Sequence, residues 1–193
     1  MLESKNFRTI KSEIRVLGID DGRFIAQTQG NAMIFGVVLR GGFWLDGVMH
    51  TDIEIDGFDS TNKIISMINN SPHRNQLRLI MLFGITFAGF NVVDIKELNI
   101  ATSLPVIVLM RKKPDLGAMR EAIKNLPRSE ERWQMVLNAG KIFEILCRGK
   151  RIYMQIAGIS ENDAKEIVEL TSTRSSFPEP LRVAHLLASG ITS

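Results

Sequence analysis

The adjacent acids Asp20 and Asp21, followed by Gly22, are the first side chains in the sequence that could do chemistry. They follow an apolar run, residues 14–19, that is typical of a buried strand. Sites in α/β sheets gather at such strand ends. A hard cation such as Mg²⁺ needs only one or two carboxylates when it keeps waters and binds a substrate phosphate. A metal site is one interpretation, and an ordinary Asp-Gly turn is the alternative.

A second group of acids lies further along the chain, at Asp52, Glu54, Asp56 and Asp59. The first three alternate with Ile53 and Ile55, which is the period of a half-buried strand and puts them on one face. If this strand neighbours the first, one of these acids could approach Asp20. The alternative is that the alternating acids face water and that Asp59 or Ser60 caps the following helix.

Two further segments could bind a ligand after buried strands. Residues 82–94 open from an apolar strand into a loop of small residues, including Gly84, Gly89 and Asn91, where a ligand can approach the backbone closely. Arg111, Lys112 and Lys113 follow the strand at 105–110, and such cations suit phosphate oxygens.

The segment 177–185 places two prolines around Glu179 at the start of the last predicted helix. Arg182 and His185 stand three residues apart and so share a helix face. We favour a structural interpretation of this pair, because a lone surface histidine usually has no chemical role.

The elements that must position these residues form an α/β pattern. Strands are predicted at 14–19, 32–39 and 43–55, as an antiparallel three-strand meander. Helices and buried strands then alternate, with strands at 77–82, 105–110 and 152–156 and helices near 60–70, 94–98, 115–124, 129–138, 160–168 and 179–189. This order predicts a mixed sheet covered by helices, in which parallel strands follow the antiparallel meander. It matches the ribonuclease H-like architecture in outline, and several other α/β folds nearly as well. No linker divides the chain, so we expect one domain over 1–193 with an N-terminal tail of about residues 1–12.

Composition excludes several classes of protein. Apolar residues make up 45% and charged residues 23%, close to globular averages, and no apolar stretch is long enough to span a bilayer. The single Cys147 fits a reducing compartment, and the first residues lack the apolar core of a signal peptide, so we expect a cytoplasmic protein. Residues 111–151 hold eleven bases and five acids, a segment that can attract phosphates, although a solvated helical surface would look the same.

Taken together, the motifs resemble an uncharacterised archaeal family related to endonuclease V, over nearly the whole chain from about residue 14 to 190. The resemblance rests on residues 15–22 (RVLGIDDG), 84–91 (GITFAGFN), 111–114 (RKKP) and 178–185 (PEPLRVAH). It implies a ribonuclease H-like fold and magnesium-dependent cutting of DNA or RNA near a deaminated adenine. It also implies a metal ligand at Asp20, an acid at Asp59 or Asp56, paired lysines at Lys112 and Lys113, and a Pro-Glu-Pro-x-Arg motif ending at Arg182.

The sequence departs from the endonuclease V pattern in three places. Phe83 stands where endonuclease V has an aspartate, Ile159 stands where it has a histidine, and the Tyr/Pro-rich wedge that probes the lesion is absent around residues 51–57. A phenyl ring cannot ligate a cation, and losing one carboxylate weakens a two-metal site.

Our first hypothesis is therefore an endonuclease V-related protein that binds or cuts nucleic acid with Mg²⁺ or Mn²⁺. Asp20 and Asp59 would be catalytic, Asp20, Asp21 and Asp59 would bind the metal, and Lys112, Lys113 and Arg182 would bind phosphate. The alternatives are a non-catalytic nucleic-acid-binding module, and a small-molecule or protein-interaction domain that uses the Gly84–Asn91 loop as its pocket.

Overall fold

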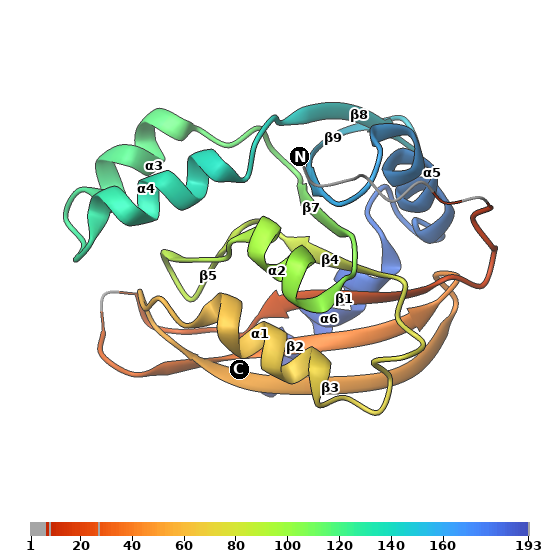
Figure 1. Ribbon diagram of the computed structural model, residues 1–193, viewed down its shortest axis with the longest axis horizontal. Helices are drawn as coiled ribbons and strands as arrows, with labels where there is room; N and C mark the ends of the chain where they lie inside the picture. The colour runs from red at the N-terminus through yellow and green to blue at the C-terminus, as the bar shows by residue number, and fades with distance from the viewer. Residues whose placement is uncertain (1–6, 8, 27, 193) are drawn as a thin grey trace.

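The computed structural model describes residue 7, residues 9–26 and residues 28–192, so the predicted tail lies partly outside the described residues. Figure 1 shows a central sheet with helices packed on both of its faces. The strands are β1 (Arg15–Asp21), β2 (Asn31–Arg40), β3 (Trp44–Glu54), β4 (Leu79–Phe83), β5 (Thr86–Phe87), β6 (Asn91–Val92), β7 (Val106–Met110), β8 (Phe143–Cys147) and β9 (Lys150–Ala157). The helices are α1 (Ser60–Asn69), α2 (Ile95–Thr102), α3 (Leu116–Ile123), α4 (Ser129–Asn138), α5 (Glu161–Thr171) and α6 (Glu179–Ile191).

Within the described residues, seven strands form one sheet in the order β3-β2-β1-β4-β7-β9-β8. The predicted meander is confirmed, because β1 pairs antiparallel with β2 and β2 with β3. β1, β4 and β7 are parallel neighbours, which brings the ends of β1 and β4 together beside Asp20. The predicted fold class, an α/β mixed sheet covered by helices, is therefore correct.

The far edge of the sheet differs from the prediction. β9 runs antiparallel to β7, and β8, which was not predicted, pairs antiparallel with β9. The turn between them is tight, with Arg148 at φ 47° and Gly149 at φ 76°. β8 is an edge strand of only five residues in which buried and exposed positions alternate, but one of the exposed residues is the apolar Leu146, so the sequence shows no apolar–polar alternation and the strand signal is weak.

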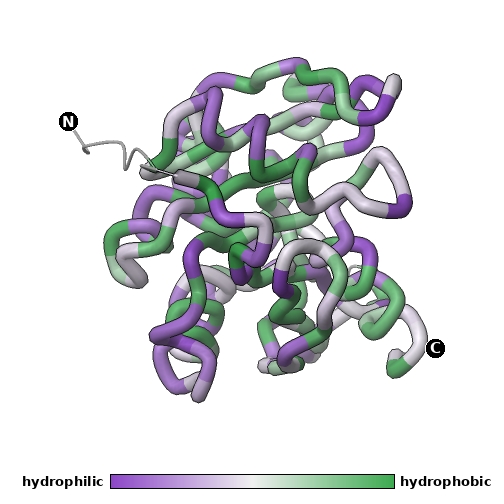
Figure 2. Tube along the Cα trace, turned by 90° about the vertical axis from the view of Figure 1, so that its right-hand side faces the viewer, coloured by the Kyte–Doolittle hydropathy of each residue, from purple (hydrophilic) through white to green (hydrophobic). Residues whose placement is uncertain are grey.

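Among the described residues, two large apolar cores fill the two faces of the sheet, and a smaller cluster packs β2 against α6. One packs β1, β2 and β4 against α1, α2 and α4, with Leu17 and Ile19 fully buried. The other packs β4, β7, β8 and β9 against α5 and the start of α6. Figure 2 shows the apolar segments running through the middle of the molecule. No helix among the described residues is long and apolar enough to cross a membrane.

Two predicted helix starts can be compared with the caps in the structure. Ser160, where a helix is predicted to begin, is the N-cap of α5, and its hydroxyl accepts a hydrogen bond from the backbone N–H of Asp163 at 3.1 Å. α1 begins at Ser60, and its N-cap is Asp59, one of the two predicted caps, although the Asp59 side chain makes no capping bond.

Candidate active site

Asp20 and Asp21 end β1 and are the acidic centre of the candidate site. Asp20 is 3% exposed, and its Oδ1 accepts a hydrogen bond from the backbone N–H of Asp21 at 3.0 Å. Asp21 Oδ2 accepts from the backbone N–H of Ala88 at 2.7 Å, which ties β1 to the loop after β5. Burial raises the pKa of Asp20 to about 6, although the His185 hydrogen bond lowers it. Burial also raises the pKa of Asp21. Two desolvated acids side by side are therefore costly to ionise together.

His185 reaches this centre from α6. Its Nδ1 lies 2.8 Å from Asp20 Oδ2, and its side chain remains 54% exposed, so the other edge of the ring is accessible. The contact depends on how closely α6 packs on β1. A Cβ at Gly18 would lie 2.3 Å from the carbonyl carbon of Pro180, so a glycine is needed two residues before Asp20.

Sequence reasoning underestimated His185 and grouped it with Arg182. The structure separates the pair, because the Arg182 guanidinium makes a two-pronged hydrogen bond to Glu179, at 2.7–2.9 Å. Glu179 is only 2% exposed, and its hydrogen bond raises the pKa of Arg182. Arg182 thus neutralises a buried acid, and its predicted role in phosphate binding stays a prediction.

An aromatic and cationic cluster of Phe83, Phe177 and Arg111 lies beside His185. The Phe83 ring is stacked with the His185 ring, with centroids 6.1 Å apart and planes at 19°. Phe83 also packs on Phe177 at 5.1 Å, and the Arg111 guanidinium lies 5.0 Å from the Phe177 centroid. Where the endonuclease V pattern has a carboxylate, this chain therefore has a ring that holds an imidazole in place.

Asp59 has different surroundings from Asp20. Its Oδ1 accepts hydrogen bonds from the Asn91 side-chain amide at 2.7 Å and from the backbone N–H of Glu54 at 3.1 Å. Asn91 is fully buried and also donates to the Glu54 carbonyl, while its Oδ1 accepts from the backbone N–H of Ser60. Asn91 therefore caps α1 and braces its entrance. The metal role predicted for Asp59 stays a prediction.

Arg132 of α4 forms hydrogen bonds to the backbone of the two loops that lead into α1 and β6. It is 2% exposed, and its guanidinium donates to the carbonyls of Gly57 at 2.8 Å and Phe90 at 2.6 Å, and to the carbonyl of Asp56. Asp56, the alternative acid, accepts from the backbone N–H of Phe90 through its side chain. Gly89 packs against that carboxylate, where a Cβ would lie 2.3 Å from Oδ1. Gly89 is therefore needed for loop packing.

A pocket of about 210 Å³ lies between the loop that begins at Gly84, the end of β7 and the α3–α4 hairpin. Lys112 and Gln155 supply polar groups, and the other lining residues are mostly apolar: Ile85, Thr86, Met110, Pro114, Leu116, Met119, Val136 and Ile142. Gln155 is 4% exposed, and its Nε2 donates to the Gly140 carbonyl at 3.0 Å. Its Oε1 accepts no hydrogen bond from the described residues.

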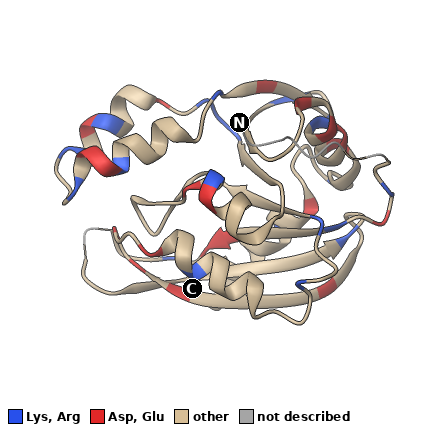
Figure 3. Cartoon of the chain, viewed as in Figure 1, with Lys and Arg blue, Asp and Glu red and all other residues tan. Residues whose placement is uncertain are grey.

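The basic segment has a less positive surface than its composition indicates. Figure 3 shows acids and bases interspersed on the α3–α4 hairpin. Lys124 pairs with Glu121, and Arg128 pairs with Glu131. In the part of the chain that the structure describes, Lys112 and Lys113 form no ion pair, and both follow β7 as predicted.

The carboxylates fit a divalent cation in one respect and fall short in another. Asp20 and Asp21 provide two adjacent oxygen donors whose charge is poorly compensated, which suits an ion such as Mg²⁺ that completes its shell with waters and phosphate. Within the described residues, however, no three His, Cys, Asp or Glu side chains gather as a ready metal-binding group. The donor set therefore fits a cation held jointly with substrate.

Solved structures share this fold. Human endonuclease V matches with a TM-score of 0.63 at 14% identity, over 97% of this chain and 90% of that chain. A protein of unknown function from Archaeoglobus fulgidus matches with a TM-score of 0.84 at 40% identity, over 93% of this chain and 98% of that chain. The fold is thus the ribonuclease H-like fold of endonuclease V, with an acidic centre at the end of its first strand.

Similarity in sequence identifies the family to which the chain belongs. The model of the Endonuclease dU family matches residues 12–192, and the chain belongs to that family. A UPF0215 protein from Methanothermobacter thermautotrophicus is 52% identical over 192 residues, covering 99% of this chain and 94% of that protein. A UPF0215 protein from Methanosarcina mazei is 52% identical over 185 residues, covering 95% of this chain and 93% of that protein. The predicted resemblance to an archaeal family related to endonuclease V is confirmed.

Proposed function

We propose that this protein is a metal-dependent endonuclease that cuts nucleic acid beside a deaminated base, with deoxyuridine in DNA as the first substrate. The observation that carries the proposal is the buried Asp20–Asp21 pair with His185 on Asp20 Oδ2 at 2.8 Å. The name of the family, Endonuclease dU, supports the choice of deoxyuridine. A Ciona intestinalis endonuclease V has been solved in complex with a DNA that contains an inosine, which supports testing inosine beside it.

Asp20 and Asp21 would hold a Mg²⁺ or Mn²⁺ ion. Asp59, the third ligand that the sequence predicts, would contribute less, because its Oδ1 already accepts from the Asn91 amide and the Glu54 N–H. The bound ion would polarise the scissile phosphate and lower the pKa of a bound water. The residues of the chain would position and move protons. In the neutral tautomer whose Nδ1–H donates to ionised Asp20, the lone pair of His185 lies on Nε2, which can take a proton from the attacking water. Stacking on Phe83 keeps the imidazole in this orientation.

The pocket beside Gly84 has the chemistry to select a deaminated base. Uracil carries an N–H at N3 where cytosine has an acceptor, and hypoxanthine carries an N–H at N1 where adenine has an acceptor. Gln155 Oε1 is an acceptor without a donor among the described residues, since the amide nitrogen is held by Gly140. A base that places its own acceptor there leaves a buried polar group unpaired, which discriminates strongly. A flipped base in this pocket would lie next to Lys112, which can contact its phosphate.

The test is a cleavage assay on matched oligonucleotides containing deoxyuridine, inosine or only ordinary bases, single- and double-stranded, with Mg²⁺, Mn²⁺ or EDTA. We expect cutting next to the deaminated base that requires the metal and is lost in Asp20→Asn. Asp52→Asn is the matched control, because Asp52 is an exposed acid of β3 outside the site. Asp20→Asn cutting as fast as Asp52→Asn would overturn the proposal.

A non-catalytic nucleic-acid-binding module is the second candidate, favoured by Phe83 in place of a carboxylate. It predicts oligonucleotide binding that falls steeply with salt, is unchanged by EDTA and is never followed by cutting.

A further inference from the structure

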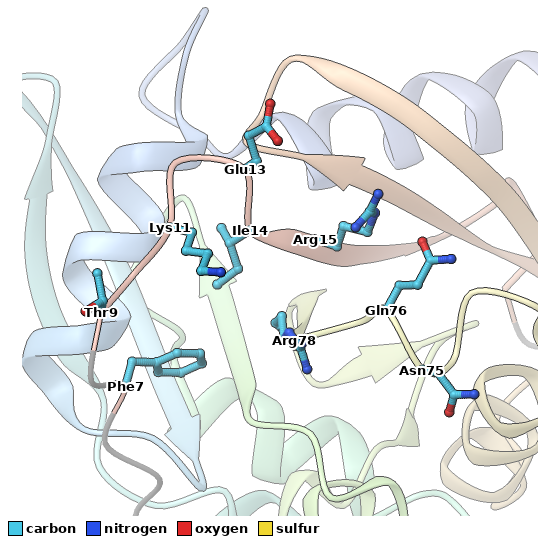
Figure 4. A pocket seen from close by; sticks show the side chains of 9 residues that line it. All are labelled: Phe7, Thr9, Lys11, Glu13, Ile14, Arg15, Asn75, Gln76 and Arg78. Carbon is cyan, nitrogen blue, oxygen red and sulfur yellow. The ribbon is translucent and has the colours of Figure 1, made fainter.

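A second concave site lies at the opposite end of β1 from Asp20. Its volume is about 410 Å³, and it is lined by Phe7, Thr9, Lys11, Glu13, Ile14, Arg15, Asn75, Gln76 and Arg78 (Figure 4). Arg15 begins β1 and Arg78 directly precedes β4, whereas Asp20 and Asp21 end β1. At about 3.3 Å per residue, the length of β1 separates the two sites by roughly 20 Å. One mononucleotide cannot occupy both.

The charges around this second pocket are unevenly balanced. Arg15 Nε is paired with Asp46 at 2.8 Å, and Glu13 lies 3.6 Å from Arg40. Lys11 and Arg78 form no ion pair with any described residue. In Figure 4 the Glu13 carboxylate extends away from both of them. Two cations that share a concave wall without a carboxylate between them attract an anion.

The other walls add complementary chemistry. Phe7 and Ile14 pack against the second apolar core and give the pocket an apolar side. Asn75 and Gln76 add two side-chain amides, each of which can both donate and accept. Cations, an apolar wall and amide groups within 410 Å³ match a phosphate joined to a sugar and base better than a bare inorganic anion.

We propose that this pocket binds a phosphate group carried on a nucleoside, with the phosphate on Lys11 and Arg78 and the base near Asn75 and Gln76. The source of the phosphate is a free mononucleotide or the 5′-phosphate end of a strand. The site is separate from the cleavage centre, so the proposal does not depend on the proposed function.

Calorimetric titration of the full chain in EDTA tests the proposal, with deoxyadenosine and deoxyuridine monophosphates, inorganic phosphate and the unphosphorylated nucleosides as probes. We expect the double variant Lys11→Ala/Arg78→Ala to lose at least about tenfold in nucleotide affinity, because two charge-assisted contacts are removed. Asp20→Asn should bind the nucleotides as the unaltered protein does. Lys63→Ala is the matched control, since Lys63 is an exposed base of α1 outside the pocket.

Three results would overturn the proposal: equal affinity in the double variant, an equal loss in Lys63→Ala, or nucleosides that bind as tightly as nucleotides. Competition by 5′-phosphorylated and 5′-hydroxyl oligonucleotides separates the two sources. Displacement by the phosphorylated strand alone supports a strand end as the ligand, whereas displacement by neither supports a free nucleotide.

Discussion

Two carboxylates predicted to share one metal site, Asp20 and Asp59, have opposite surroundings. Asp20 is buried, burial raises its pKa to about 6, and its neighbours are Asp21 and a half-exposed imidazole. Asp59 is half-buried and accepts hydrogen bonds from a side-chain amide and a backbone N–H. Both carboxylates have two hydrogen-bonding partners, so the number of partners does not separate them. Asp20 differs because it is desolvated beside a second acid, which makes its charge costly and favours a bound cation or proton.

Cleavage activity is where we expect the largest difference between the two acids. Asp20→Asn should lower the single-turnover cleavage rate by about 10³-fold, because the variant loses a metal-binding oxygen and the partner that orients His185. Asp59→Asn should lower it less than about tenfold, since its amide oxygen can still accept from Asn91. Equal losses would mean that Asp59 also ligates the metal.

The packing of α6 on β1 should matter almost as much for activity. A Cβ at Gly18 would meet the Pro180 backbone at 2.3 Å, so Gly18→Val must push α6 and His185 away from Asp20. We expect a loss of about 1–3 kcal/mol in the free energy of unfolding, measured in urea, together with a loss of cleavage. Gly190→Ala is the control, because nothing lies within 4 Å of a Cβ there. Full activity in Gly18→Val would contradict the Asp20–His185 contact.

Replacing the two acids should change the free energy of unfolding in opposite directions. Asp59→Ala removes the acceptor for the Asn91 amide and leaves a buried donor unpaired, which should lower the free energy of unfolding by about 1–3 kcal/mol. Asp20→Asn should instead raise it at neutral pH in EDTA, because an amide carries no charge to desolvate. Urea unfolding of both variants measures these changes in free energy. If both variants were destabilised, the expected difference between the two acids would be wrong.

The free energy of unfolding should depend on pH through Asp20. Its pKa is raised from 3.8 to about 6, so the folded state binds this proton more tightly than the unfolded state. Its contribution to stability is therefore present below pH 3.8 and is lost as pH rises to about 6. The advantage of Asp20→Asn should grow across that window, to about 1–3 kcal/mol, and stay constant above it. Added Mg²⁺ should stabilise only proteins that keep Asp20.

Much of the fold was readable from local pattern. The meander, the buried parallel strands β4 and β7, and the helices near 129–138 and 160–168 follow from hydrophobic periodicity. β8 was missed because a short edge strand alternates too weakly to signal itself.

The sequence by itself determined which reactive side chains the site could use. Acids that follow one buried strand, and lysines that follow another buried strand, can be recognised from neighbouring residues alone. Only the tertiary structure decided which groups meet. His185 is 165 positions from Asp20, and it reaches that acid only because Gly18 lets α6 sit against β1. Phe83 reads as a lost ligand in the sequence and acts as a support for the imidazole in the fold. Asn91 reads as a loop residue and becomes the brace of Asp59. Contacts between segments that are far apart in the sequence depend on how helices and strands pack. The spacing of residues within one segment carries no information about that packing.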